Sequence, residues 1–327
     1  RARARGVRAR AADSSRPPAE PFVTAEDARR GEVARAWVSE LYDCVDYAAV
    51  FAAAEQAAVR EDDVEDDVAD ALSGGEGERM YGEFDMGFFV ALLRSLEPEL
   101  ALLERGDVDG GAVGNGVFVD VGSGRGQLVC VASVARKWQR CVGLEVDAAL
   151  HAVATQVALR SPNEDVVTDD LLDAFPVAAR PMTQSPISFV CGNMYDRNDL
   201  RAALENATLV FAFATKFRRD DDDDRVATST SIGALDACAS FDDCDDACGK
   251  TPYLTLSRHI RPHLRVGALA VIVNGALRES EGFDLIATRR GPDAERNGRD
   301  SVARVYRVAE VRCDARDDKA GEKRRKK

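Results

Sequence analysis

The sequence predicts a doubly wound α/β domain with a helical segment in front of it. Two observations predict this fold. After residue 116, short apolar runs alternate with stretches of helical periodicity, and a glycine-rich turn joins the first run to the first helical stretch. Strands that alternate with helices are joined by right-handed crossovers and form a parallel sheet. The chain has 327 residues, 45% of them hydrophobic, which is enough for one large domain with its own core.

The part of the chain before this domain is predicted to be largely helical. Residues 1–22 are rich in Arg, Ala, Ser and Pro, and we expect a disordered basic tail there. Residues 23–104 form the helical segment. Its first helix begins at a capping box of Thr24 and Asp27 and continues through an Ala-rich stretch to about Val59. A second helix is predicted to end before a proline, and its residues are Phe88, Phe89, Leu92, Leu93 and Leu96, followed by Pro98.

Residues 105–312 form the α/β domain. An insert rich in Asp, Ser and Ala at 218–250 interrupts its pattern, and we expect this insert to be disordered. Residues 313–327 form a second basic tail. The last two strands, Phe283–Ala287 and Val302–Val308, have no helix between them and are predicted to pair in antiparallel fashion. The other strands are predicted at Val117–Val121, Cys141–Val146, Ile187–Cys191, Leu209–Phe213 and Ala268–Val273, and the helices at Gln127–Trp138, Ala148–Leu159, Asp199–Leu204 and near Leu254–Leu264.

Charge is distributed unevenly along the chain, whose net charge is -13. The acid gathers at 61–70 and 220–224, whereas both ends are basic. This argues against a nucleic-acid surface over the fold, so nucleic-acid contact is expected only through the tails. The acidic clusters suit a basic protein partner, or they are solvated loops. The basic run at 323–327 resembles a nuclear address, while the Arg-rich start resembles a transit-peptide remnant, which leaves cytoplasm or an organelle as the alternative to the nucleus.

Neither a membrane nor a metal is expected as a partner. No apolar run has the length of a membrane span. The eight cysteines show no paired C-x-x-C spacing, and we interpret Cys130, Cys141 and Cys191 as buried thiols because each falls in an apolar run. His259 and His263 are expected on a helix surface, since no further ligand stands at a recognisable spacing.

The strongest motif is the glycine-rich turn after the first strand, Asp120–Gln127, with the spacing G-x-G-x-G. Glycines there let the backbone approach a ligand closely and supply turns with positive φ. In an open parallel sheet, ligands bind outside the carboxyl ends of the strands. Asp120 is placed to organise the ammonium end of a zwitterionic ligand. Taken alone, the glycines fit a tight structural turn equally well.

Polar residues at the next two strand ends favour a nucleoside ligand. Glu145 ends the second strand, where a carboxylate can accept both hydroxyls of a ribose. That interaction serves NAD and S-adenosylmethionine alike. At the end of the third strand, Asn193 can bind the adenine edge and Met194 can pack on its face. Three such features at successive strand ends favour ligand binding over a purely structural turn.

Two of these segments resemble a known family. The run Phe118–Gln127 resembles the cofactor loop of the histone H3 core-lysine methyltransferases of the disruptor-of-telomeric-silencing type. Upstream, Met80–Phe84 resembles the Y-G-E loop that closes over the cofactor in that family. The similarity covers roughly residues 80–308 without the insert. It implies a Rossmann-like, seven-stranded class I methyltransferase sheet, S-adenosyl-L-methionine as cofactor, and transfer of a methyl group to a lysine of histone H3 in the nucleosome.

The resemblance also implies the site residues. The methyl acceptor must be a neutral amine aligned with the sulfonium, chiefly by positioning in a dry, partly aromatic channel. The cofactor pocket that the resemblance implies consists of Tyr81, Glu83, Asp120, Gly122, Gly124, Gln127, Glu145, Asn193 and Met194.

The segment after the fourth strand departs from the family pattern. The family carries Asn residues there, but their positions fall on Phe213 and Ala214. Thr215 and Phe217 are therefore the candidates to line the acceptor channel. The departure leaves two alternatives beside the histone-directed enzyme. One is a methyltransferase that acts on another protein or a small molecule, and the other is a cofactor-binding protein without catalytic activity.

Overall fold

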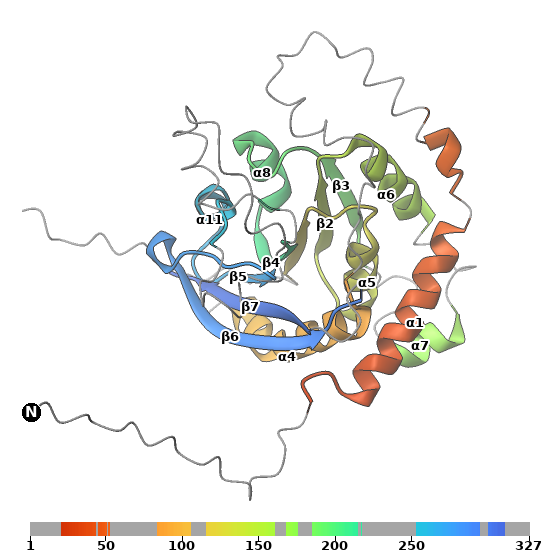
Figure 1. Ribbon diagram of the computed structural model, residues 1–327, viewed down its shortest axis with the longest axis horizontal. Helices are drawn as coiled ribbons and strands as arrows, with labels where there is room; N and C mark the ends of the chain where they lie inside the picture. The colour runs from red at the N-terminus through yellow and green to blue at the C-terminus, as the bar shows by residue number, and fades with distance from the viewer. Residues whose placement is uncertain are drawn as a thin grey trace, which may run out of the picture.

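The structure is a computed structural model that describes residues 21–43, 45–50, 52, 84–105, 116–160, 168–175, 185–214, 217, 253–294 and 300–310. At its centre lies a seven-stranded sheet (Figure 1). The strands are β1 Val117–Val121, β2 Arg140–Glu145, β3 Ile187–Cys191, β4 Ala207–Phe213, β5 Leu269–Val273, β6 Phe283–Pro292 and β7 Asp300–Val308. Their spatial order is β3-β2-β1-β4-β5-β7-β6.

The pairing confirms the predicted Rossmann-like, seven-stranded sheet. Strands β1 to β5 pair in parallel, whereas β7 runs antiparallel to both β5 and β6. The chain builds outward from β1 to β3 on one side and from β4 to β5 on the other. The order therefore reverses between β1 and β4, and the carboxyl ends of all five parallel strands lie at one edge of the sheet.

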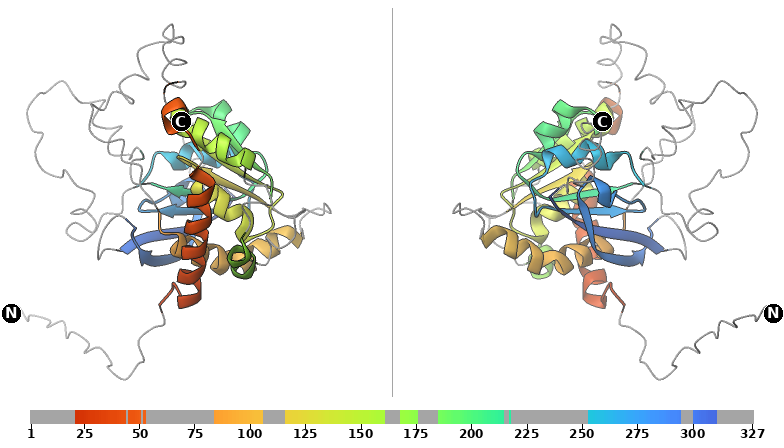
Figure 2. Two further views of the ribbon diagram at one scale, coloured as in Figure 1. Left: turned by 90° about the vertical axis from the view of Figure 1, so that its right-hand side faces the viewer. Right: turned by 90° about the vertical axis from the view of Figure 1, so that its left-hand side faces the viewer.

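Helices cover both faces of the sheet (Figure 2). The first face packs against α4 Met86–Arg105, α5 Gln127–Ala135 and α6 Ala148–Arg160, and the second against α8 Arg197–Leu204 and α11 Leu256–Ile260. Alternation along the strands decides which residues face which layer. On β1, Phe118 lies in the first layer, where its ring meets that of Phe89 at 5.9 Å, while Val117, Val119 and Val121 lie in the second.

Helix α1, Ala25–Tyr42, crosses α4 at very close range. A Cβ on Gly31 would stand 2.3 Å from the backbone nitrogen of Gly87, so only glycine allows this approach. The predicted capping box is present, since Thr24 Oγ1 accepts from the Asp27 amide at 3.1 Å. The buried Asp27 carboxylate also receives two hydrogen bonds from Arg94 on α4, at 2.8 and 2.9 Å. The helical segment is thereby fixed to the domain.

Several predicted helix ends differ from the structure. Helix α5 ends at Ala135 and not at Trp138, because the backbone of Arg136 is extended, and α8 begins at Arg197 and not at Asp199. Helix α4 continues past Pro98 to Arg105, because Leu100 beyond the proline is fully buried and the packing of that turn offsets the lost hydrogen bond. Helix α1 ends at Tyr42, because Asp46 accepts from the Ala49 amide and starts a separate turn. The stretch that continues to Val59 lies outside the described residues.

The predicted helix near Leu254–Leu264 is reduced to α11 and the 3-10 turn η2, Arg261–His263, because Pro262 has no amide hydrogen to continue the helix. Two short elements were not predicted, namely the helix α7 Asp169–Ala174 and the 3-10 turn η3 Glu279–Glu281. The prediction that Cys191 is buried is wrong, because β3 is an edge strand and leaves this side chain exposed. Cys130 and Cys141 are buried as predicted. In the described parts of the chain, no helix combines the length and apolarity needed to cross a membrane.

Candidate functional site

The glycine loop between β1 and α5 has a backbone that only glycine adopts without strain at three points. The φ angles of Gly122, Gly124 and Gly126 are 76°, 54° and 84°. The amides of Gly122 and Ser123 both donate to the Leu144 carbonyl, at 2.8 and 3.0 Å. The loop is thus tied to the end of the neighbouring strand β2, at the point where the strand order reverses.

Glu145, the last residue of β2, ties down the middle of the same loop. Its Oε2 accepts from the Gly124 amide at 2.7 Å and its Oε1 from the Asp147 amide at 2.9 Å. The side chain is 7% exposed. Burial raises its pKa, although the hydrogen bonds from the two amides favour the charged form. Each carboxylate oxygen retains capacity for a further donor, as the predicted binding of ribose hydroxyls requires.

Asp120 lies beside Glu145 in the sheet. It alternates with Val119 and Val121, so its side chain is on the α5 face, and it is only 3% exposed. Burial raises the pKa of Asp120 to about 8, and the negative charge of Glu145 adds to this shift. Two neighbouring buried carboxyl groups make the site favourable for a cationic ligand.

Met194 and Phe217 lie against the glycine loop at Gly122. A Cβ built on Gly122 would lie 3.2 Å from two ring carbons of Phe217 and 3.7 Å from the Met194 methyl group. Both side chains are partly buried and pack on the second layer of the core. The structure therefore brings together Gly122, Met194 and Phe217, three predicted site residues from different segments of the chain.

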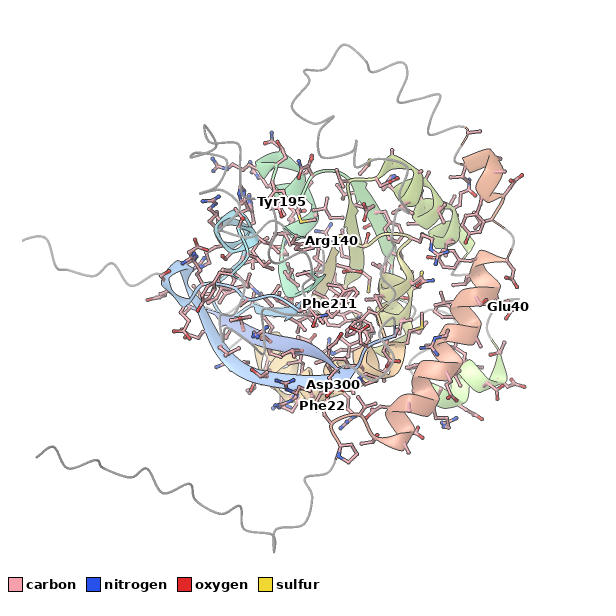
Figure 3. The ribbon with its side chains drawn as sticks, in the orientation of Figure 1. Phe22, Glu40, Arg140, Tyr195, Phe211 and Asp300 are labelled. Atoms are coloured by element: carbon pink, nitrogen blue, oxygen red, sulfur yellow. The ribbon has the colours of Figure 1, made fainter. Side chains whose placement is uncertain are left out.

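Asn193 is held in a turn after β3. Its side-chain Oδ1 accepts a hydrogen bond from the backbone amide of Tyr195 at 2.9 Å. Its backbone amide donates a hydrogen bond to the Asp199 carboxylate at 2.8 Å. Figure 3 shows Tyr195 beside α8 and α11, at the same end of the sheet. The side-chain oxygen of Asn193 thus already accepts a hydrogen bond, so a ligand would contact mainly the side-chain NH2 group of Asn193. Gln127 begins α5 directly after the loop.

The two positions that differ from the family pattern belong to the apolar core. Ala214 is buried, and its amide donates to the Val273 carbonyl at 2.9 Å. The ring of Phe213 lies 5.3 Å from that of Phe84, which is buried among Phe88, Phe211 and Phe213. Phe84 follows directly on the predicted lid residues. Tyr81, Glu83 and Thr215 lie outside the described residues, so their predicted roles stay predictions.

Two contributions to the loop were not predicted from the sequence. Phe189 on β3 lies under it, since a Cβ on Gly126 or on Gly143 would stand 2.3 or 2.5 Å from its ring. A glycine inside an apolar strand, such as Gly143, is the signal that could have indicated this close approach. The second contribution comes from Tyr42, whose hydroxyl donates to the Arg125 carbonyl. No local pattern indicates a contact between residues so far apart in the sequence.

Comparison with known proteins gives remote structural likenesses. No family model and no curated protein matches the chain. The rRNA methyltransferase aviRa from Streptomyces viridochromogenes is 16% identical with a TM-score of 0.42, over 76% of this chain and 96% of that one. The B. subtilis M1A22 tRNA methyltransferase TrmK is 10% identical with a TM-score of 0.33, over 65% of each chain. The glycopeptide N-methyltransferase MtfA, complexed with (S)-adenosyl-L-methionine, is 13% identical with a TM-score of 0.27, over 64% of this chain and 65% of that one. Likenesses this remote carry no inference about what the chain binds or modifies.

Proposed function

We propose that this protein is an S-adenosyl-L-methionine-dependent methyltransferase. The observation that carries the proposal is the arrangement at the carboxyl edge of the sheet. There, three glycines of positive φ, the buried carboxyl groups of Asp120 and Glu145, and the apolar side chains of Met194 and Phe217 converge at the reversal of strand order.

The residues present fit this cofactor. S-adenosylmethionine carries positive charge on its ammonium and sulfonium groups, and such charge offsets the burial and the neighbouring Glu145 charge that raise the pKa of Asp120. Glu145 stands at the strand end where a ribose is held in related folds. A dinucleotide instead presents a pyrophosphate, which two nearby carboxylates disfavour.

Each side chain has a definite task in the proposed reaction. When bound, the cofactor supplies an electrophilic methyl group. Glu145 holds the glycine loop through the Gly124 amide and accepts the ribose hydroxyls. Asp120 is assigned to the cationic end of the cofactor, whose positive charge favours ionisation of this carboxyl group on binding. Phe213, the last residue of β4, packs against Phe84 in the first core layer.

Two acceptor classes follow from different observations. The resemblance of residues 80–84 and 118–127 to the histone H3 core-lysine methyltransferases supports a lysine of histone H3 in the nucleosome as acceptor. Phe213 and Ala214 stand where that family has Asn and are packed into the core, which supports a different protein or a small molecule. Incubation with labelled cofactor, nucleosomes and a lysate freed of histones separates the two classes, because the label enters histone H3 in one case and other material in the other.

Calorimetric titration with S-adenosylmethionine tests the cofactor proposal. For the wild type we expect a dissociation constant in the micromolar range, which corresponds to a binding free energy of about -8 kcal/mol. We expect no measurable binding for Glu145→Ala or Gly124→Arg. Glu205→Ala, at an exposed carboxylate remote from the loop, is the matched control and should bind like the wild type. Tighter binding of NAD than of S-adenosylmethionine, or undiminished binding by Glu145→Ala, would contradict the proposal.

A further inference from the structure

The C-terminal end of α1 contacts Arg125, which is the one large side chain within the glycine loop. The hydroxyl of Tyr42 donates a hydrogen bond to the Arg125 carbonyl. The Arg125 guanidinium lies over the Tyr42 ring, 5.6 Å from its centroid, and donates to the Tyr47 hydroxyl at 3.5 Å. Residues of the helical segment thus hold both the backbone and the side chain of Arg125.

The hydrogen bond from Tyr42 adds a second restraint to the peptide unit between Arg125 and Gly126. The peptide between Arg125 and Gly126 is bonded at both ends, because its carbonyl accepts from Tyr42 and its amide donates to Ser123 at 2.8 Å. Gly126 has a φ of 84° and caps α5, and glycine has little intrinsic preference that would hold such a conformation. The two hydrogen bonds therefore hold Gly126 in a backbone conformation that glycine by itself does not favour over others.

The element that carries Tyr42 is itself anchored to the domain. Asp27 binds Arg94 through two hydrogen bonds, and Gly31 crosses Gly87 at backbone contact. In Figure 3, Glu40 lies on α1 and Phe211 lies on β4 at the centre of the sheet. The glycine loop is therefore held from two sides, by Leu144 and Glu145 of the sheet and by Tyr42 of the helical segment.

We propose that Tyr42 is a positioning residue of the cofactor site, which makes the N-terminal helical segment a determinant of cofactor affinity. The inference rests on the proposed function. A loop already held in its binding conformation loses less conformational entropy when the ligand binds. Loss of the Tyr42 hydroxyl should therefore weaken cofactor binding. Tyr42 acts on the loop through its hydrogen bond to Arg125 and not by contact with the ligand.

Tyr42→Phe tests this, because it removes the hydroxyl and keeps the ring under Arg125. We expect the dissociation constant for S-adenosylmethionine to rise roughly fivefold to tenfold. In the ligand-free protein, hydrogen exchange should accelerate at the amides of 122–127 but not at those of α4 or β5. Tyr47→Phe is the matched control, since it removes the hydroxyl that meets the guanidinium at 3.5 Å but keeps the Tyr42 hydrogen bond to the Arg125 carbonyl, and its affinity should stay within about twofold of the wild type.

The outcomes separate this inference from the proposed function. An unchanged affinity for Tyr42→Phe, or exchange that accelerates equally throughout the domain, would overturn the positioning role. If the wild-type protein bound no S-adenosylmethionine, the proposed function would fall. The exchange comparison would then still decide whether Tyr42 orders the loop.

Discussion

At the level of single residues, Asp120 links the proposed site to the stability of the fold. Its carboxyl group is buried next to that of Glu145, and its pKa is raised from 3.8 to about 8. Between these two values the folded protein binds more protons at this group than the unfolded chain does. Stability therefore falls as the pH rises through this window, and the contribution is fully present only below pH 4.

Asp120→Asn should remove this dependence. Relative to the variant, the wild-type protein should lose up to about 1.4 kcal/mol of unfolding free energy per pH unit between pH 5 and pH 8. Urea unfolding of both proteins across this range measures the difference. Asp284→Asn, at an exposed carboxylate of β6, should leave the slope unchanged. Parallel slopes for the wild type and Asp120→Asn would show that Asp120 is ionised in the folded protein throughout.

Residue types and local spacing predicted much of the site, but not what surrounds it. The G-x-G-x-G turn and Glu145 were predicted because strand ends and glycine spacing are local features of the sequence. The roles of Tyr42 and Phe189 depend on packing between segments that are distant along the chain. Such contacts follow from the folded arrangement and leave no periodic signal.

At the level of elements, the crossing of α1 and α4 depends on one glycine. Gly31→Ala should destabilise the protein by about 2 kcal/mol, even though alanine favours helices by about 1 kcal/mol over glycine. The added methyl group would stand 2.3 Å from backbone that cannot move aside without shifting a helix. Urea unfolding monitored by circular dichroism measures the change.

Gly87→Ala at the same crossing is the matched control. Its Cβ would come no closer than 3.2 Å to Ala28 and Asp85, so a small adjustment accommodates it and its cost should be clearly smaller. Equal costs for both substitutions would mean that α1 lies further from α4 than described. The contrast between two glycines, both buried in helices, isolates steric contact from helix propensity.

The element boundaries show where sequence patterns lose their predictive value. The buried parallel strands were predicted almost to the residue because their apolar runs are short and bounded by polar turns. Helix α4 was cut short at Pro98, since the cost of a proline is local whereas the burial of Leu100 that offsets it is a tertiary effect. Helix ends were therefore less predictable than the parallel strands, whereas the antiparallel strand β6 runs to Pro292 and not to the predicted Ala287.

At the level of the whole molecule, one core joins the helical segment to the sheet. A single apolar cluster contains Trp37 of α1, Phe89 of α4 and Phe211 of β4. The two tryptophans of the chain, Trp37 and Trp138, report on the two parts separately. In single-tryptophan variants made with Phe, fluorescence should give the same urea midpoint for both probes. A lower midpoint for Trp37 would show that the segment unfolds as a separate unit.

The position of β7 has a consequence for how the chain is made. β7 is the last strand of the domain in the sequence, yet it lies inside the sheet between β5 and β6. While the polypeptide is being synthesised, β5 and β6 exist before their shared neighbour does. The growing chain thus carries two unpaired strand edges until residues 300–308 are released from the ribosome, and those edges are the surfaces on which a nascent chain aggregates. Completion of the sheet waits for β7, the last strand in the described part of the chain, so a shortened product ending before β7 should be a substrate for chaperones or proteases rather than a weakened folded protein.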